Sequence, residues 1–221
     1  ETNIVGAKNI IEASLEKKVK KVIALSTDKA VSPVNLYGAT KLCSDKLFIA
    51  ANNFKGKKDI SFSVVRYGNV LGSRGSVVPF FKNLNGKNFF PITDLNMTRF
   101  SLTLNEGVSF VMKSLNMSIG GEIFVPKIPS YKIKDVAMAI NPKAKIKIIG
   151  IRPGEKIHED LISINDNGNT VEAKDFYLIL SDKKHKLFKK YKKVNDNFFY
   201  NSGKNKNFLS VGSLRKLIKK I

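Results

Sequence analysis

Residues 3–66 alternate between two hydrophobic patterns. Over residues 3–18, apolar positions recur every three or four residues, which predicts a helix. Residues 19–26 form a short apolar run bounded by Lys and Ser, which is typical of a strand buried on both faces of a parallel sheet. The same two patterns predict a second helix over 37–54 and a second strand over 60–66. This helix–strand–helix–strand order with short connections predicts an α/β fold with a parallel sheet.

The pattern becomes shorter and more mixed after residue 68. We expect a loop at 72–75, helices at 77–84 and 106–115, strands at 122–126 and 145–150, a helix of about two turns that begins at Arg152, a turn at 165–169, and a basic amphipathic helix at the end of 198–221. Short elements of both kinds predict a second, mixed α/β region.

Composition limits the classes of protein that the chain can represent. With 221 residues and 43% hydrophobic content, it can bury a substantial core. No run approaches the roughly 18 apolar residues of a membrane-spanning helix, so we expect no membrane segment. A single cysteine, Cys43, excludes a disulfide within the chain and favours a reducing cytoplasm. We interpret Cys43 as a buried structural thiol rather than a nucleophile, because small and apolar residues surround it on a predicted helix.

The net charge of +21 does not by itself indicate a nucleic-acid partner. Lys supplies nearly all of the positive charge and is spread along the chain, whereas specific base and phosphate recognition relies on Arg. The densest cluster runs from Lys183 to Lys193 and includes Phe188 and Tyr191. A solvated helix face explains this cluster better than an anionic partner does. The positive field would still attract an anionic substrate.

Tyr37 and Lys41 are the first residues whose spacing indicates chemistry. Four positions apart on a helix, they share one face, one turn from each other. A phenol is a poor base at neutral pH, but a cation one turn away favours its ionised form. Such a pair can take a proton from a sugar hydroxyl while hydride leaves for a nicotinamide. The spacing alone is a weak signal, because many helices contain it by chance.

Polar residues follow both predicted strands. The first strand ends in Ser26-Thr-Asp-Lys29, and the second in Arg66-Tyr-Gly-Asn-Val-Leu-Gly-Ser-Arg-Gly75. Ligands of open α/β sheets bind beyond the carboxyl ends of the strands, so both segments lie where a ligand would bind. Asp28 and Lys29 alone would be interpreted as an exposed ion pair in a turn, but beside a Tyr/Lys pair they indicate an active site. With two histidines and no cysteine cluster, we expect no metal site.

Several motifs, in order along the chain, resemble one family. They are Ser26-Thr-Asp-Lys-Ala-Val31, Tyr37-Gly-Ala-Thr-Lys41, Arg66-Tyr-Gly-Asn-Val-Leu-Gly-Ser-Arg-Gly-Ser-Val-Val-Pro79, Pro91-Ile-Thr-Asp94, Met97-Thr-Arg-Phe100, Arg152-Pro-Gly-Glu-Lys-Ile-His-Glu159, Tyr200-Asn-Ser-Gly203, Phe208-Leu-Ser-Val211 and Leu214-Arg-Lys-Leu-Ile218. The set resembles the extended short-chain dehydrogenases that dehydrate UDP-N-acetylglucosamine. The resemblance covers essentially the whole chain. One departure is Ser101, where relatives often carry Trp, and we expect it to alter packing rather than chemistry.

Two positions narrow the resemblance. Related dehydratases of glucose nucleotides carry Asp-Glu in place of Asp28-Lys29, which points here to the acetamido-sugar group. Membrane-anchored and retaining relatives carry Met in place of Tyr37, which favours the inverting enzymes that begin pseudaminic acid synthesis. The resemblance therefore implies a cytoplasmic lyase, an inverting UDP-N-acetylglucosamine 4,6-dehydratase with NADP as its cofactor.

The resemblance also implies a role for each matching residue. Tyr37, helped by Lys41, would deprotonate the hydroxyl on sugar carbon 4. Lys29 would remove the hydrogen on carbon 5, and Asp28 would help the carbon 6 hydroxyl leave as water. The implied cofactor contacts are Ser26, Thr27, Tyr37, Lys41, Val70, Leu71, Gly72, Ser73 and Arg74, and the implied substrate contacts are Thr27, Asn69, Arg152 and Glu155.

Within the substrate site, Arg152 would bind the diphosphate and Glu155 a ribose hydroxyl. His158 is interpreted as a structural or surface residue rather than a catalyst. The implied partners are UDP-N-acetylglucosamine and further copies of the chain in a homo-oligomer.

The resemblance implies two consecutive regions. Residues 1–75 would be the second half of a dinucleotide-binding domain, and 76–221 mainly a UDP-sugar domain with a carboxyl-terminal helix. The implied fold is a partial Rossmann-type parallel sheet whose first strands are missing, with a smaller mixed α/β domain. The sequence contains neither the Gly-rich turn that holds a cofactor pyrophosphate nor the residue that selects NAD or NADP. Because Glu1 is not an initiator Met, we expect the chain to begin inside a longer protein.

Alternatives of two classes stay open. A retaining dehydratase or a UDP-sugar 4-epimerase would use the same scaffold, although an epimerase needs no carbon 5 base such as Lys29. A non-catalytic nucleic-acid-binding protein would use the charge of +21, and its binding to DNA or RNA would be tight and salt-sensitive. In that case the Tyr/Lys and Asp/Lys pairs would be coincidences.

We predict that residues 1–221 alone neither bind the nicotinamide cofactor well nor turn over, because they contain no pyrophosphate-binding turn. The check is to incubate the purified 221-residue chain with UDP-N-acetylglucosamine and NADP and to follow the sugar by NMR. Measurable dehydration by this chain alone would contradict the prediction.

Overall fold

The computed structural model describes residues 1–84, 86, 89–143 and 145–221, which form two compact units. Unit 1 comprises Glu1–Tyr67, Val108–Lys127 and Asp160–Tyr200, and unit 2 comprises Gly68–Gly107, Ile128–Glu159 and Asn201–Ile221. The expected order of two consecutive regions, 1–75 and 76–221, is replaced by an interleaved one. The physical reason is that strands from the two later segments of unit 1 complete a sheet that its first segment begins.

Unit 1 is built on a six-stranded mixed sheet. In order across the sheet, its strands are β1 (Lys21–Thr27), β2 (Ser61–Tyr67), β6 (Glu122–Pro126), β11 (Phe176–Leu180), β10 (Thr170–Glu172) and β12 (Lys192–Lys193). β1, β2 and β6 are parallel, and the other neighbours are antiparallel. The predicted α/β fold with a parallel sheet is therefore confirmed.

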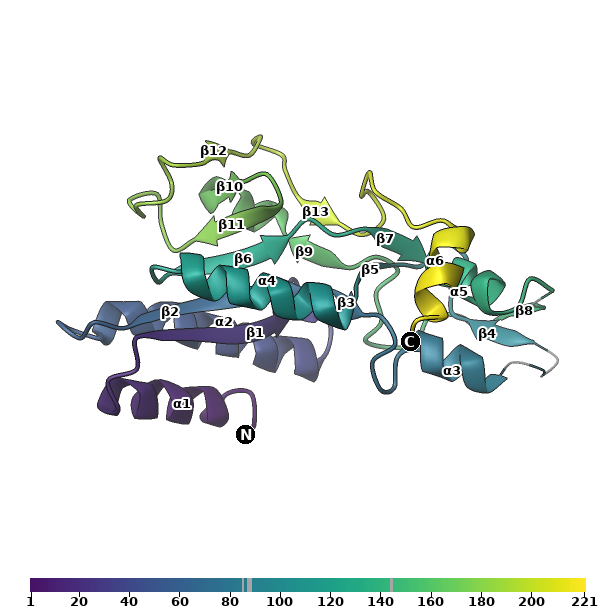
Figure 1. The fold of residues 1–221 in the computed structure, drawn as a ribbon, viewed down its shortest axis with the longest axis horizontal. Coiled ribbons are helices and arrows are strands. Elements are labelled where there is room, and N and C mark those ends of the chain that lie inside the picture. The colour runs from purple at the N-terminus through teal and green to yellow at the C-terminus, as the bar shows by residue number, and fades with distance from the viewer. Residues whose placement is uncertain (85, 87–88, 144) are drawn as a thin grey trace. The chain divides into compact units, whose positions relative to one another are not determined.

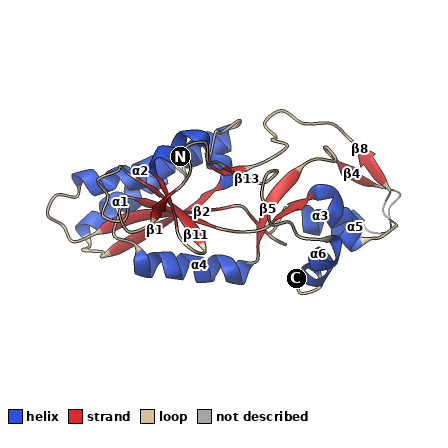
Figure 2. Cartoon of the chain, turned by 90° about the horizontal axis from the view of Figure 1, so that it is seen from above, coloured by secondary structure: helices blue, strands red, loops and turns tan. Residues whose placement is uncertain are grey.

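Helices cover both faces of this sheet (Figures 1 and 2). They are α1 (Val5–Glu16) and α2 (Leu36–Phe54) on one face and, on the other, α4 (Leu104–Met117), of which residues 108–117 belong to unit 1. Successive side chains of a strand point to opposite faces. Phe62 of β2 therefore packs against Phe48 of α2, with ring centroids 6.4 Å apart. Val65 points the other way, into the buried cluster against which Phe110 of α4 packs.

The first strand, β1, is not buried on both faces as its apolar run predicted. Among the described residues it pairs only with β2, so it is an edge strand, and its Leu25 is 48% exposed. The same apolar run suits a central or an edge strand, because a hydrophobic pattern does not report how many neighbours a strand has.

Cys43 is exposed, which contradicts its interpretation as a buried thiol. The face of α2 that packs inward carries Gly38, Asp45, Phe48 and Ala51. Successive members of this set are three or seven residues apart, and Cys43 falls outside that series.

The predicted helix across the lysine cluster 183–193 is also wrong. These residues form turns that lead into β12. Phe188 and Tyr191 pack against the buried cluster that contains Phe176, while the lysines of the segment are exposed. The lysines therefore face solvent as predicted, but on turns instead of a helix.

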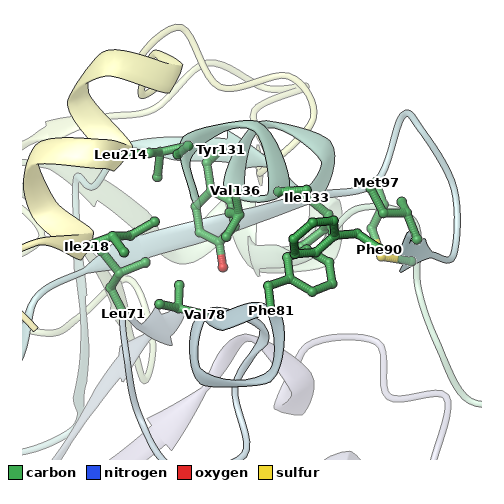
Figure 3. Close-up of a cluster of buried hydrophobic side chains, with 13 residues drawn as sticks. Leu71, Val78, Phe81, Phe90, Met97, Tyr131, Ile133, Val136, Leu214 and Ile218 are labelled. Atoms are coloured by element: carbon green, nitrogen blue, oxygen red, sulfur yellow. The ribbon is translucent and has the colours of Figure 1, made fainter. Parts of the chain in front are cut away.

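Unit 2 contains small sheets and short helices around one core (Figure 3). A three-stranded sheet has the order β3 (Asn69–Val70), β5 (Thr98–Leu102) and β7 (Ser130–Lys132), and β4 (Phe90–Ile92) pairs with β8 (Ile146–Ile148). The helices are α3 (Val77–Leu84), α5 (Ile133–Ile140) and α6 (Val211–Ile218). Tyr131 is 2% exposed within this core, where Phe81 and Phe90 stack edge to face with centroids 5.3 Å apart. Leu214 and Ile218 of α6 complete the cluster.

The predicted helix at Arg152 is a tight turn. The Glu155 backbone N–H donates to the Arg152 carbonyl at 3.1 Å, and Gly154 has a φ of +80°. Pro at the second position and a left-handed Gly at the third are the sequence of a type II turn, which a helix cannot accommodate. The Pro-Gly pair was the sequence signal that the helix prediction overlooked.

Two short 3-10 helices and one strand pair remain. They are η1 (Asp28–Ala30), η2 (Ile164–Asn169), and β9 (Asp160–Ile162), which pairs with β13 (Tyr200–Asn201). None of the described helices has the length and apolar character that a membrane crossing requires.

Candidate active site

The carboxyl ends of β1 and β2 lie side by side in unit 1. Their parallel register pairs Ser26 with Arg66, and Thr27 with Tyr67. The short 3-10 turn η1 follows β1 directly. Residues 26–29 therefore lie at the carboxyl ends of the strands, where open α/β proteins bind ligands, as the sequence predicted.

Asp28 is fully buried and forms an ion pair with Lys29. Its Oδ1 accepts hydrogen bonds from the Lys29 ammonium at 2.8 Å and from the Thr27 hydroxyl at 2.9 Å. Its Oδ2 is buried and has no hydrogen-bond partner among the described residues, so a ligand group can bond to it. An ordinary exposed ion pair would not have this geometry.

Helix α2 carries the other two predicted catalytic residues. It begins after Asn35, whose side chain accepts from the Gly38 N–H at 2.9 Å. Tyr37 is 52% exposed in the first turn. One turn later, the Lys41 ammonium donates to the Leu25 carbonyl of β1 at 2.6 Å. Lys41 thus reaches the end of the strand that leads into Asp28.

A close backbone contact joins α2 to η1. A Cβ added at Gly38 would collide with the carbonyl oxygen of Lys29 and would touch Pro33. Only glycine allows the helix to approach η1 this closely. The residue after Tyr37 is therefore in contact with the backbone of Lys29, which brings the two predicted catalytic segments together.

Sequence reasoning missed Tyr67. Burial raises the pKa of its phenol, and the charge of Tyr37 raises it further. Tyr67 is the last residue of β2, and its phenol interacts electrostatically with that of Tyr37 on α2. The signal in the sequence was its position, directly after a strand and before Gly68-Asn69.

Unit 2 contains a cavity of about 650 Å³, a volume typical of small-molecule sites. Three of the predicted substrate contacts line it: Asn69, Arg152 and Glu155. The side-chain oxygen of Asn69 is buried without a hydrogen-bond partner among the described residues, as is the hydroxyl of Ser76, which also lines the cavity. Both groups can bond to a ligand.

Arg152 and Glu155 are paired across the turn that contains them. Glu155 accepts from Arg152 Nε at 3.0 Å, and the Arg152 Nη2 lies 2.7 Å from the same oxygen. Burial raises the pKa of Glu155, but the hydrogen bonds from Arg152 and the charges of Arg152 and Arg99 outweigh it and leave the pKa below its usual value. The cavity wall therefore combines cationic guanidinium groups with one ionised carboxylate.

Arg99 is a second cation at this cavity, and it is absent from the site residues that the sequence predicted. Its Nη1 donates to the carbonyls of Thr98 at 2.7 Å and Ile157 at 3.1 Å, and its Nε lies 3.7 Å from a Glu159 oxygen. Two guanidinium groups in one cavity suit a diphosphate. The motif Met97-Thr-Arg-Phe100 was the available signal.

His158 has a structural environment, in agreement with its interpretation. Its Nδ1 is 2.8 Å from the Thr98 hydroxyl, which is 2.7 Å from the Ser202 hydroxyl. The Ser202 hydroxyl also accepts from the Glu159 N–H. This network joins β5 to the segment after the Arg152 turn.

The predicted cofactor segment Val70–Arg74 follows β3 in unit 2. Gly72 has a φ of +80°, and the Ile221 side chain packs so close to it that an added Cβ would collide. Arg74 is exposed. The glycine thus permits a close approach, and in this structure the approaching group is the Ile221 side chain.

The predicted residues fall into two groups. Unit 1 holds Ser26, Thr27, Asp28, Lys29, Tyr37 and Lys41, and unit 2 holds Asn69, the segment Val70–Arg74, Arg152 and Glu155. Within the described ranges, no cluster of His, Cys, Asp and Glu side chains could bind a metal ion.

We expect Gly38→Ala to destabilise the chain by about 1–3 kcal/mol, because the new methyl group overpacks the contact with Lys29. The matched control is Gly6→Ala in the first turn of α1, where an added Cβ meets nothing within 4 Å. The control should gain up to about 1 kcal/mol from helix propensity. Urea unfolding of both variants checks the prediction, and equal shifts of the two midpoints would contradict it.

We expect the Glu155 carboxyl to titrate below an ordinary Glu, and Arg152→Gln to move its titration upward. A carboxyl whose folded pKa is depressed adds stability above its unfolded pKa, and this stability is lost as the pH falls through the folded pKa. Carbon-13 NMR titration of the Glu155 side chain measures both midpoints. An unchanged midpoint in the variant would show that Arg152 is not the cause.

Known proteins resemble the chain over most of its length. Residues 1–181 match the family described as polysaccharide biosynthesis protein. The chain is 53% identical to the UDP-N-acetylglucosamine 4,6-dehydratase (inverting) of Campylobacter jejuni, over 98% of the chain and 69% of that protein. It is 40% identical to the UDP-glucose 4-epimerase of Rickettsia canadensis, over 86% of the chain and 57% of that protein.

A solved structure, that of Pen from Bacillus thuringiensis, superposes with a TM-score of 0.86 at 36% identity. The match covers 99% of the chain and 68% of Pen. These similarities do not support the nucleic-acid-binding alternative. The family match and the order of the motifs lead to the same conclusion: the chain belongs to the polysaccharide biosynthesis protein family.

Proposed function

We propose that the chain serves the 4,6-dehydration of UDP-N-acetylglucosamine with inversion at carbon 5, with NADP as the cofactor. The observation that carries this proposal is the ion pair between the buried Asp28 and the partly exposed Lys29, next to the helix of Tyr37 and Lys41. A carboxyl, an amine and a phenol that follow the carboxyl end of β1 supply the acid and base groups that a dehydration needs. The 53% identity to an inverting dehydratase supports the assignment.

The groups of unit 1 fit the nicotinamide end of a dinucleotide. An exposed phenol and an ammonium group lie one turn apart beyond the end of a parallel strand. When bound, the cofactor supplies a hydride acceptor for carbon 4 and a hydride donor for carbon 6. Tyr37 takes the proton of the carbon 4 hydroxyl, and the Lys41 cation stabilises the phenolate and binds the ribose.

Elimination of water requires a base and an acid on the same sugar. The ketone at carbon 4 acidifies the hydrogen on carbon 5. In this scheme the Lys29 ammonium first passes a proton to Asp28 along their 2.8 Å hydrogen bond, and the neutral amine that remains takes the carbon 5 proton. The electron pair of the broken bond forms a double bond between carbons 5 and 6. The carbon 6 hydroxyl takes a proton from Asp28 and leaves as water. Hydride addition at carbon 6 and protonation of carbon 5 from the opposite face then complete the inversion.

Unit 2 binds the nucleotide in this proposal. Arg152 and Arg99 line the same cavity and suit the two phosphate groups, while Asn69 has a buried oxygen available to a donor of the sugar nucleotide. Glu155 accepts from a ribose hydroxyl. Residues 1–75 contribute the cofactor contacts, including Ser26, Thr27 and the segment Val70–Arg74.

We further propose the finer assignments that the motifs imply. The cofactor is NADP rather than NAD, the product enters pseudaminic acid-type sugar synthesis, and the enzyme works in the cytoplasm as a homo-oligomer. The presence of Tyr37 at the position where retaining relatives carry Met supports the inverting outcome.

A UDP-sugar 4-epimerase is the second candidate, because the Rickettsia relative carries that name. An epimerase needs only the hydride and proton transfer at carbon 4, which Tyr37 and Lys41 supply. It gives no role to the amine of Lys29 or to the buried Oδ2 of Asp28. The dehydratase accounts for both groups.

We expect the full-length protein that contains residues 1–221 to incorporate deuterium at carbon 5 and release water when it acts on UDP-N-acetylglucosamine in D2O with NADP. Lys29→Met should abolish both, because the carbon 5 base is lost. The matched control, Lys46→Met, removes an exposed lysine of α2 and should retain both. NMR of the product decides: interconversion of carbon 4 epimers without deuterium uptake would identify an epimerase.

A further inference from the structure

Unit 1 also contains a buried network of hydrogen bonds and one ion pair, formed by Asp45, Arg66 and Ser26. Asp45 of α2 and Arg66 of β2 form an ion pair at 3.1 Å, with side chains only 2% and 4% exposed. The same Asp45 oxygen accepts from the Ser26 hydroxyl of β1 at 2.7 Å. Arg66 also donates to the Leu161 carbonyl of β9 at 3.2 Å. Four elements of unit 1 therefore meet at one guanidinium–carboxylate pair.

The position of Asp45 along α2 connects this network with the reacting groups. Asp45 is four residues after Lys41 and eight after Tyr37, so the three side chains project from one face of the helix. Each turn of this face has its own contact with the segment 25–29. Gly38 meets the Lys29 carbonyl, Lys41 donates to the Leu25 carbonyl, and Asp45 accepts from Ser26.

These three contacts differ in kind. The Gly38 contact is steric, and the Lys41 contact uses a side chain that the proposed reaction requires for another task. Asp45 alone contributes a buried, charged bond that takes no part in the chemistry. It is therefore the contact that can hold α2 in register when Lys41 binds a ribose.

The cost of burial argues against a role in stability alone. A buried ion pair is often no more stabilising than apolar residues of similar size, because desolvation cancels much of the attraction. The Nε of Arg66 is also buried without a hydrogen-bond partner among the described residues, which adds to the cost. The Asp45 carboxylate accepts hydrogen bonds from two partners, Ser26 and Arg66, in fixed directions. The geometry that these bonds fix explains why a carboxylate with this desolvation cost is buried here.

We propose that Asp45, with Arg66 and Ser26, is a positioning group that sets the register of α2 against β1 and η1, and so the placement of Tyr37 and Lys41 relative to Asp28 and Lys29. The inference rests on the proposed function for its kinetic consequence. Asp45 does not touch substrate in this scheme and acts through the helix. The assignment of the Ser26 hydroxyl to the cofactor stays a prediction, since here that hydroxyl donates to Asp45.

Cys43 offers a test of the register that needs no turnover. It is the single cysteine of the chain, exposed, and two residues before Asp45 on α2. A nitroxide attached to Cys43 reports the motion of this helix by electron paramagnetic resonance. We expect Asp45→Asn to make the label more mobile, and Ser26→Ala, a milder change that keeps the ion pair, to do so to a smaller degree.

The matched control is Glu122→Gln. Glu122 is also a fully buried carboxylate of unit 1 that accepts from a serine hydroxyl, Ser63, at 2.6 Å, but it lies at the start of β6, at the other end of the strands. Thermal unfolding places the variants on one stability scale. Glu122→Gln should lose stability without mobilising the Cys43 label.

Steady-state kinetics of the full-length protein with UDP-N-acetylglucosamine give the functional result. A misplacement of catalytic groups by about 1 Å costs about 100-fold, so we expect kcat of Asp45→Asn to fall roughly 10- to 100-fold. KM for the sugar nucleotide should stay within about twofold, because unit 2 supplies the nucleotide contacts. Ser26→Ala should show the same split with a smaller loss, and Glu122→Gln should keep kcat.

The outcomes separate this inference from the proposed function. A mobilised label with a selective loss of kcat supports the positioning role. An unchanged label in both network variants, or equal mobilisation by Glu122→Gln, overturns it, as does an unchanged kcat. If the unmodified protein shows no dehydration, the proposed function fails, and the label alone decides the inference.

Discussion

The parallel pairing of β1 with β2 is the constraint on which the candidate site depends. The two strands are paired from Lys21 opposite Ser61 to Thr27 opposite Tyr67, so their carboxyl ends lie on the same side of the sheet. Parallel strands need a crossover between them, and α2 is that crossover. The β1–α2–β2 motif therefore brings three polar segments to the carboxyl ends of its strands: the end of β1, the first turns of α2 and the end of β2. The reacting groups need no separate scaffold.

Burial decides which of these polar groups are suited to chemistry. Asp28 is fully buried, yet its Oδ2 has no hydrogen-bond partner among the described residues, whereas Tyr37 on the neighbouring helix is half exposed. Unit 2 repeats the contrast, with the buried amide oxygen of Asn69 in a cavity whose rim carries the exposed Arg152. A sugar nucleotide has both an uncharged ring and a diphosphate. Covered polar atoms and accessible cations are the two kinds of surface that it requires.

The elements were largely predictable, and their neighbours were not. Helix and strand periods located α2, β2, α3 and β6 to within a residue or so, because those patterns are local. The same patterns missed that β1 has one neighbouring strand among the described residues and that Cys43 is exposed, since both depend on what packs beside them. At Arg152 a local signal was present in Pro153-Gly154, and the helix prediction overlooked it. Tyr67 and Arg99 each had a local signal in the sequence, but their surroundings at the site depend on segments that are distant along the chain.

The interleaving of the two units has a consequence for synthesis. β6 of unit 1 pairs with β11, some fifty residues later, and the core of unit 2 includes α6 at the carboxyl end. Neither unit can close until nearly all of the chain has left the ribosome. Such long-range pairing slows folding and leaves apolar strand edges uncovered in the meantime. The strong positive charge spread over the chain then keeps unfinished molecules apart through mutual repulsion, a benefit that is independent of any substrate.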